Sequence, residues 1–251
     1  MKQIQALILA AGKGKRINAQ DKPKVLFPLA GKPLILYGLK SLKEAGFEKP
    51  IVVVGFQGQK VQELLKERVV YCWQRKLLGT ANAVLQAQKA LGNAKSVLII
   101  YGDMPLWKPA TFKKLIRKHR QTKATLSFVS VILKNPSFFQ YGRLVRDEDG
   151  KILRSIEEKE ATNEEKKIQE CNPSCYLVEA KWLWRALLKI KKSSSGEYYL
   201  TDILNLAVSE RKKINILPIE DWREVIGINT EEQLRLAKNA LKRYADLDLL
   251  P

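Results

Sequence analysis

Residues that could form disulfides or a histidine-based site are scarce in this sequence. Its 251 residues include three cysteines, Cys72, Cys171 and Cys175, and a single histidine, His119. An odd number of irregularly spaced cysteines without a CxxC pair argues against both a disulfide framework and a zinc site, so we expect small buried hydrophobic residues in a reducing compartment. One histidine leaves no Ser-His-Asp set, and its lysine-rich surroundings predict that His119 is solvated.

Long hydrophobic runs are also absent. The longest, Ala6–Ala11 and Val97–Tyr101, are far shorter than the roughly 20 residues that a membrane helix needs. The N-terminal residues lack the hydrophobic segment and cleavage site of a signal peptide. A hydrophobic content of 45% is enough for a substantial core, so we expect a cytoplasmic protein with no membrane partner.

Acidic residues are outnumbered by basic ones, 26 against 45, which gives a formal net charge of +19. The basic residues recur at helical spacing between apolar residues in Phe112–Lys123, Trp184–Lys192 and Arg235–Arg243, a pattern typical of the solvated faces of amphipathic helices. The sequence has no RNP1 string, no KH-type GXXG clamp and no zinc-finger spacing. We therefore do not expect nucleic acid as a partner.

In the first half of the chain, short apolar runs alternate with segments of helical periodicity. This order is typical of right-handed βαβ crossovers, and it predicts an α/β fold with a Rossmann-like, mostly parallel sheet that carries helices on both faces. The predicted strands are Ile4–Leu9, Ile51–Val54, Val69–Cys72 and Val97–Tyr101, and the predicted helices are Leu34–Ala45, Lys60–Glu67 and Thr80–Leu91.

After about residue 123 the pattern changes to a small β-rich lobe. Asp147–Gly150 is a turn signal between Gly142–Arg146 and Ile152–Ile156, which predicts a hairpin in which Asp147 and Asp149 are turn residues. We find no internal repeat and no linker, so we expect a single domain over residues 1–251. The other elements predicted here are the strands Ala124–Leu133, Ile214–Pro218 and Val225–Ile228, and the helices Ala180–Ile190, Tyr198–Glu210 and Glu231–Tyr244.

A glycine-rich segment, Leu9–Arg16, follows the first predicted strand, at the end where open α/β sheets bind their ligands. Gly12 and Gly14 allow backbone N–H groups to approach phosphate oxygens, and Lys13, Lys15 and Arg16 add positive charge. A dinucleotide-binding loop would need a third glycine where Ile17 stands, and the Walker A spacing is also missing. By itself the segment favours a tight strand-to-helix turn with solvated lysines.

Together with Lys22–Leu26, this segment resembles the signature of the sugar-nucleotide pyrophosphorylases, which reads L-A-A-G-x-G-T-R with a downstream P-K. Lys15 stands where the family usually has threonine. Further segments are similar to the N-acetylglucosamine-1-phosphate uridyltransferase members of this family, over most of the chain. They are Gln74, Leu78–Ala81, Tyr101–Asp103, Tyr141–Arg143, Ile156–Lys159, Glu170–Asn172, Glu197–Asp202 and Gly227–Asn229.

The resemblance implies the fold of nucleotide-diphospho-sugar transferases, with a mainly nucleotide-binding part over residues 1–123 and a mainly sugar-binding part over residues 124–251. It implies an enzyme that forms UDP-N-acetylglucosamine, a cell-wall precursor, and pyrophosphate from UTP and N-acetylglucosamine 1-phosphate. Lys24 would bind the α-phosphate, and Lys13 and Arg16 the leaving pyrophosphate. The implied nucleotide-binding residues are Leu9, Ala10, Ala11, Gly12, Gly14, Lys24, Gln74, Gly79 and Thr80.

For the metal and the sugar, the resemblance implies a Mg²⁺ ion held by Asp103 and Asn229, and a sugar bound by Tyr101, Gly142, Glu157 and Asn172. Oxygen ligands suit Mg²⁺, although a strand-end turn at Asp103 and a helix cap at Asn229 would explain these two residues separately. The sequence also departs from the family. Pro173 and Ser174 replace the usual Thr-Gly, and Asn82 replaces a common histidine.

Two other interpretations stay open at this stage. The chain could be a pyrophosphorylase for another pair of substrates, such as glucose 1-phosphate with dTTP or CTP, or a catalytically silent nucleic-acid-binding protein. Bifunctional members of the family carry a C-terminal β-helix of hexapeptide repeats, which this sequence does not contain, so we expect no acetyltransferase activity and no trimer formed through such a domain.

Overall fold

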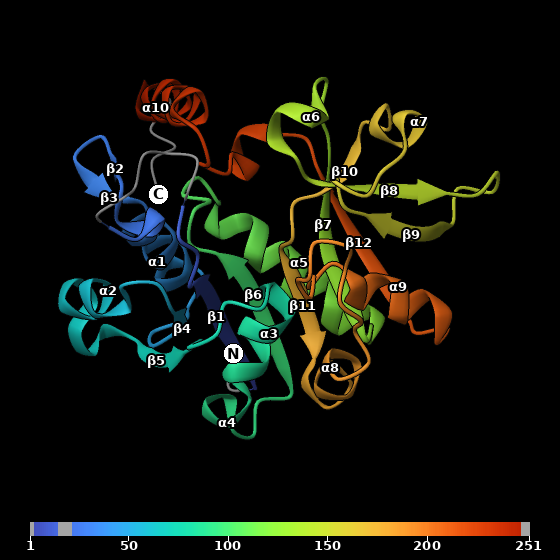
Figure 1. Cartoon of the computed structure of the whole chain (residues 1–251), viewed down its shortest axis with the longest axis horizontal. Helices are drawn as coiled ribbons and strands as arrows, with labels where there is room; N and C mark the ends of the chain where they lie inside the picture. Colours follow the sequence, from blue (N-terminus) through green and yellow to red (C-terminus); the bar gives the residue numbers. More distant parts are fainter. Residues whose placement is uncertain (1–2, 15–21, 247–251) are drawn as a thin grey trace.

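A ten-stranded sheet runs through the molecule in the order β5-β4-β1-β6-β11-β7-β10-β8-β9, with β12 also paired to β7 (Figure 1). The computed structural model describes residues 3–14 and 22–246. The pairs β5–β4, β4–β1, β1–β6 and β12–β7 are parallel, whereas β11 runs antiparallel between β6 and β7. The predicted mostly parallel sheet is confirmed. Its strands are β1 Ile4–Ala10, β4 Ile51–Val54, β5 Val70–Trp73, β6 Ser96–Tyr101, β7 Leu126–Ile132, β8 Gly142–Arg146, β9 Ile152–Ile156, β10 Glu170–Asn172, β11 Tyr176–Glu179 and β12 Ile214–Ile219.

Helices cover both faces of this sheet. Side chains alternate along β1, so that Ala6 and Ile8 belong to the core on one face and Leu7 and Leu9 to the core on the other. The first core is closed by α1 Leu34–Glu44, α2 Gly58–Leu65, α5 Pro109–Thr122 and α10 Glu231–Asp246. The second is closed by α3 Thr80–Gln86, α4 Gln88–Leu91, α8 Ala180–Leu187 and α9 Asp202–Ser209.

The β-rich lobe extends the sheet beyond β7. The short strand β10 pairs with both β7 and β8, and β8 pairs with β9 to form the predicted hairpin, which projects at the right of Figure 1. At its turn, Asp147 Oδ1 accepts the N–H of Lys151 at 2.7 Å and its carbonyl accepts the N–H of Gly150 at 3.0 Å. Asp147 is thus a turn residue, as predicted. The remaining short elements are the hairpin β2 Pro28–Leu29 and β3 Lys32–Pro33, the helices α6 Pro136–Phe139 and α7 Asn163–Lys166, and the 3₁₀ turns η1 Lys24–Leu26, η2 Lys66–Arg68 and η3 Trp222–Val225.

One predicted strand is wrong. Val225–Ile228 is not paired with any strand of the described sheet, because Val225 ends the 3₁₀ turn η3 and the residues after it pass the end of β6 in an irregular conformation. The backbone there is held by a hydrogen bond from the N–H of Ile228 to the carbonyl of Asp103, 3.0 Å long. The apolar residues of Val225–Ile228 are buried in the core without being part of the sheet.

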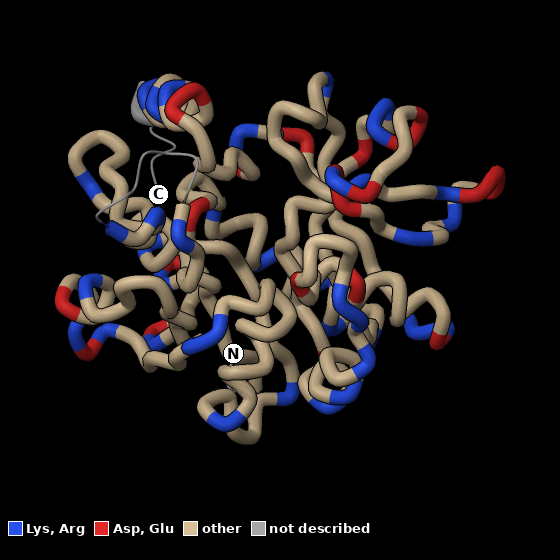
Figure 2. The backbone as a smooth tube through the Cα atoms, in the orientation of Figure 1, with Lys and Arg blue, Asp and Glu red and all other residues tan. Residues whose placement is uncertain are grey.

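Lysines and arginines lie along several helices and also on strands and loops (Figure 2), and the predicted solvated face is confirmed for α5. On α5, Lys113, Lys114, Arg117 and Lys118 are exposed, whereas Phe112, Leu115 and Ile116 on the other side are buried. The three cysteines are buried and free, also as predicted. Within the described ranges, no helix is long and apolar enough to cross a membrane.

The expectation that His119 is solvated is wrong. The residue is 6% exposed, and its Nδ1 lies 2.8 Å from the hydroxyl of Ser127 on β7. Its position explains this, because His119 follows Phe112, Leu115 and Ile116 on the apolar stripe of α5. Burial, with a smaller effect of the neighbouring Arg120 charge, lowers the pKa of His119 from 6.5 to about 4.

We therefore expect His119 to make the protein less stable in acid. Between pH 6.5 and 4 the unfolded chain binds a proton that the folded protein does not, so the free energy of unfolding falls as the pH falls through this range, by up to about 3 kcal/mol. Urea unfolding of the natural protein and of His119→Gln at pH 7 and pH 4.5 measures the effect, since glutamine does not titrate. Equal losses of stability in the two proteins would contradict the prediction.

Candidate active site

A cleft of about 760 Å³ opens beside the carboxyl ends of β1 and β6 and takes residues from both halves of the chain. This is where open α/β sheets bind their ligands. Arg16 lies outside the described residues. The cleft brings together the other candidate residues, which are Leu9, Ala10, Ala11, Gly12, Lys13, Gly14, Lys24, Gln74, Gly79, Thr80, Tyr101, Asp103, Gly142, Glu157, Asn172 and Asn229.

The glycine loop lies directly against Lys24. Gly14 has φ +66°, and a Cβ atom there would lie 2.7 Å from Cβ of Lys24, so both the backbone conformation and the close contact require glycine. Lys13 lies earlier in the loop, and its Nζ is 5.7 Å from the centre of the Phe56 ring. The loop therefore places the charge of Lys13 at the cleft and packs against Lys24.

The ammonium group of Lys24 joins the two predicted metal ligands. Its Nζ donates to the carboxylate of Asp103 and, at 2.7 Å, to Oδ1 of Asn229. The side chains of Lys24 and Asp103 are only 15% and 13% exposed. Two oxygen atoms from distant parts of the chain thus contact the same ammonium group in the cleft. The role of Lys24 towards the α-phosphate stays a prediction.

A network of hydrogen bonds brings Asn229 to this point. The hydroxyl of Tyr141 accepts the N–H of Gly227 at 2.9 Å and donates to the carbonyl of Val225. A Cβ at Gly227 would lie 2.7 Å from the same hydroxyl, so this approach requires glycine. The N–H of Asn229 in turn donates to Oε1 of Gln233 at 2.7 Å. Tyr141 therefore fixes the path of the segment that carries Asn229.

Gln74 follows β5 and is 4% exposed. Its backbone N–H donates to the carbonyl of Val54 at 2.8 Å. Its side-chain Nε2 donates to the carbonyl of Gly79 and to Oδ1 of Asn82, both at 2.9 Å. The two hydrogens of Nε2 are therefore committed. Among the described residues, nothing donates to Oε1, which makes this oxygen the atom of the carboxamide that can bind a ligand.

Thr80, the first residue of α3, connects this helix with a distant segment. Its hydroxyl oxygen accepts the N–H of Leu200 at 2.9 Å. Next to it, Tyr198 pairs with the backbone on both sides, accepting the N–H of Ala81 and donating to the carbonyl of Leu78, at 2.9 Å each. Two of the sequence segments that carried the resemblance are thus bound to each other, which the sequence did not predict.

Glu157 supplies a carboxylate to the cleft. It accepts the hydroxyl hydrogen of Thr201 at 2.5 Å. Burial raises the pKa of Glu157 above its usual range, against the lowering effect of the Thr201 hydrogen bond, and the neighbouring carboxylate of Asp202 raises it further. A carboxylate with few protein donors is a suitable acceptor for hydroxyl groups of a ligand. Thr201 is a functional candidate that the sequence pattern did not identify.

Asn172 is fully buried and already has partners. Its Nδ2 donates to the hydroxyl of Tyr176 at 2.7 Å, and its Oδ1 accepts the N–H of Ser174 at 3.0 Å. Ser174 has φ +62°, a conformation that favours glycine, where the family usually has glycine. One hydrogen of Nδ2 and one lone pair of Oδ1 are without a partner among the described residues, and the sugar contact of Asn172 stays a prediction.

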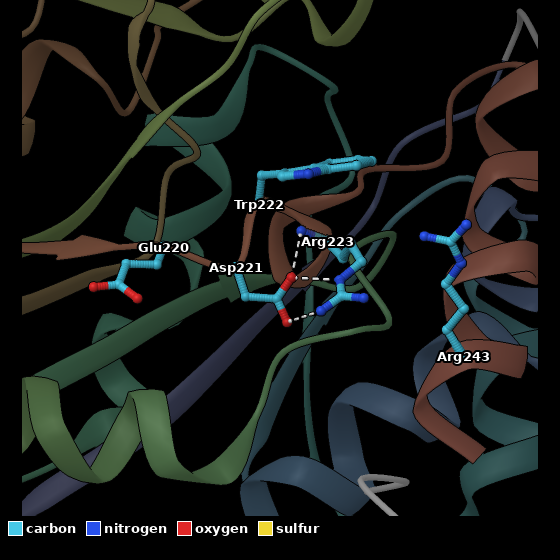
Figure 3. A pocket seen from close by; sticks show the side chains of 5 residues that line it. All are labelled: Glu220, Asp221, Trp222, Arg223 and Arg243. Atoms are coloured by element: carbon cyan, nitrogen blue, oxygen red, sulfur yellow. Dashed lines mark hydrogen bonds and ion pairs between the residues drawn. The ribbon is translucent and has the colours of Figure 1, made fainter. Parts of the chain in front are cut away.

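A second hollow lies on another side of the fold, between η3 and α10, with a volume of about 360 Å³. Figure 3 shows its charged residues. The carboxylate of Asp221 is held by the guanidinium of Arg223, with Nε at 2.6 Å, and by Lys108 at 2.6 Å. The hollow takes its residues from η3, the residues just before it and α10 alone, and none of the predicted site residues lines it.

The two oxygen ligands beside Lys24 fit a hard cation better than a transition metal. Asp103 and Asn229 present one carboxylate and one amide oxygen, the ligand types that Mg²⁺ takes together with phosphates and water. In the part of the chain that the structure describes, no group of three or more His, Cys, Asp or Glu side chains could hold a metal. Besides these two side chains, a metal at this site would take water or substrate oxygens as ligands.

The model of the nucleotidyl transferase family matches residues 5–242. The chain belongs to the nucleotidyl transferase family. It is 39% identical over 250 residues to the bifunctional protein GlmU of Syntrophomonas wolfei, covering 99% of the chain and 55% of that protein. It is 40% identical over 245 residues to GlmU of Carboxydothermus hydrogenoformans, covering 97% of the chain and 54% of that protein.

This nucleotidyl transferase chain spans about half the length of the curated relatives that it matches. Among solved structures it is similar to UDP-glucose pyrophosphorylase complexed with UDP-glucose, with a TM-score of 0.78 and 20% identity over 95% of this chain and 98% of that one. The apo form of a UDP-glucose pyrophosphorylase gives the same TM-score of 0.78 at 19% identity, over 96% and 99% of the two chains. At such identities the similarity concerns the fold.

Proposed function

We propose that the chain transfers the uridylyl group of UTP to N-acetylglucosamine 1-phosphate, with Mg²⁺, and thereby forms UDP-N-acetylglucosamine. The observation that carries this proposal is that the side-chain oxygens of Asp103 and Asn229 both contact the ammonium group of Lys24 beside the glycine loop. The similarity to GlmU proteins and the membership of the nucleotidyl transferase family support the same chemistry.

In the proposed reaction an oxygen of the sugar 1-phosphate attacks the α-phosphorus of UTP. A new P–O bond forms, and the bond from the α-phosphorus to the bridging oxygen breaks as pyrophosphate leaves. The attacking oxygen is already ionised near neutral pH, so the protein needs no general base, and catalysis consists of alignment and neutralisation of charge. Lys24 would serve the α-phosphate, and Lys13 and Arg16 the pyrophosphate.

Asp103 and Asn229 would hold the metal through their side-chain oxygens. When bound there, Mg²⁺ would neutralise the phosphate oxygens and keep them in position for the displacement. The present contacts of Lys24 support this assignment, because they show that the two oxygens together accommodate a positive charge.

The Gln74 carboxamide supports uracil or thymine as the base. Its free Oε1 is an acceptor, which matches the N3–H group of these bases, whereas cytosine has an unprotonated nitrogen at that position. For the sugar, the buried carboxylate of Glu157 supports a ligand rich in hydroxyl groups. The acetamido group is inferred from the similarity to the GlmU proteins.

The test is pyrophosphate release measured for UTP, dTTP and CTP, each with N-acetylglucosamine 1-phosphate and with glucose 1-phosphate. We expect UTP to exceed CTP in kcat/KM by roughly 5-fold to 150-fold, because cytosine would leave the buried Gln74 oxygen unpaired at a cost of ~1–3 kcal/mol. We also expect N-acetylglucosamine 1-phosphate to be the better sugar substrate. A clear preference for CTP, or for glucose 1-phosphate, would refute the corresponding half of the proposal.

A further inference from the structure

Asn82 contacts the candidate base-reading residue and not the cleft itself. It is the third residue of α3, half-buried, and it is absent from the residues that line the cleft. Its Oδ1 accepts a hydrogen of the Gln74 side chain at 2.9 Å. At this position the family usually has a histidine, so neither the fold nor the resemblance assigns a role to an asparagine here.

A carboxamide such as that of Gln74 can turn by half a rotation and exchange its oxygen and nitrogen, which have nearly the same shape. The carbonyl of Gly79 can only accept, so it selects the orientation in which Nε2 faces it. That carbonyl accepts one of the two Nε2 hydrogens. Asn82 Oδ1 accepts the other, so a turned Gln74 carboxamide would lose two hydrogen bonds and place its oxygen against the Gly79 carbonyl and, with Asn82 in its present orientation, against Asn82 Oδ1.

We propose that Asn82 is a positioning residue that keeps the Gln74 oxygen directed to the base and thereby sets the preference for a base with an N–H group. The inference rests on the proposed function and adds to it the residue that controls base selectivity. Without the Asn82 contact, the second Nε2 hydrogen is unpaired in a residue that is 4% exposed, and the Gly79 carbonyl alone holds the orientation of the carboxamide.

Two variants separate positioning from packing. Asn82→Asp keeps an acceptor at Oδ1, whereas Asn82→Leu keeps the size and removes it. The measured quantity is the ratio of kcat/KM for UTP to that for CTP, with N-acetylglucosamine 1-phosphate as the second substrate. We expect Asn82→Asp to keep the ratio of the natural protein within about 2-fold, even if its added negative charge lowers both rates, and Asn82→Leu to reduce the ratio by about 10-fold.

A purely structural role would lower both rates together and leave the ratio unchanged. An unchanged ratio in Asn82→Leu, alongside a natural protein that prefers UTP, would overturn this inference and leave the proposed function standing. A natural protein without any preference for UTP would instead refute the proposed base recognition itself. Should Asn82→Leu be inactive, titration of the variants with UMP and CMP gives the same ratio as binding constants, and thermal unfolding shows whether the variant is folded.

Discussion

Replacing Asp103 with asparagine is expected to lower kcat/KM for pyrophosphate release by at least ~10-fold to 100-fold, because a proposed metal ligand loses its charge while its size is kept. The fold should survive, since asparagine has nearly the same size and keeps the backbone carbonyl that accepts the N–H of Ile228. The affinity for Mn²⁺, measured by electron paramagnetic resonance in the presence of UTP, should fall in parallel with the rate.

Asp221→Asn is the matched control for this variant. Asp221 also lies partly buried and paired with a lysine, Lys108, but it belongs to the second hollow and not to the cleft. Its replacement should reduce stability and leave kcat/KM within about 3-fold of the natural value. Full activity of Asp103→Asn, or full activity of the natural protein in excess chelator, would show that the site does not use a metal in this way.

The sequence predicted the sheet well where the pattern is local. Ile51–Val54 and Val97–Tyr101 are short apolar runs, and such runs are buried strands when helices cover both faces. The strands β10 and β11 were missed, because β10 has three residues of which two are polar, and β11 continues into α8 without a turn residue between them. The burial of His119 could have been predicted from the sequence, because His119 lies at helical spacing from the buried residues Leu115 and Ile116 of α5. The neighbouring lysine and arginine residues led to the wrong prediction that it is solvated.

The candidate site was predicted through resemblance, and most of its contacts have no local signal. Asp103 and Asn229 are more than a hundred residues apart, and only the fold places both beside Lys24. The bonds of Thr201 to Glu157 and of Asn82 to Gln74 depend on how helices and loops pack against the sheet. A sequence shows which residue types are present, whereas these pairs arise from tertiary structure.

Gly79 provides a prediction from backbone geometry. Its φ of +103° is one that side chains rarely allow, and a Cβ there would lie 2.5 Å from the carbonyl oxygen and 2.6 Å from the nitrogen of Tyr198. Neither backbone atom can move alone, because Tyr198 pairs with Leu78 and Ala81. We expect Gly79→Ala to lower the free energy of unfolding by ~3 kcal/mol or more, through backbone strain of ~1–2 kcal/mol and the added overlap.

Gly196→Ala separates these two contributions. Gly196 has φ +80°, and a Cβ there would have nothing within 4 Å, so this variant carries the strain of a positive φ without the overlap and should lose only ~1–2 kcal/mol. The carbonyl of Gly79 also orients Gln74, so Gly79→Ala should raise KM for UTP, whereas Gly196→Ala should not. Denaturant unfolding and steady-state kinetics of both variants test this. If the two lose equal stability and bind UTP equally well, the close approach of Gly79 to Tyr198 does not hold the base-binding loop in place.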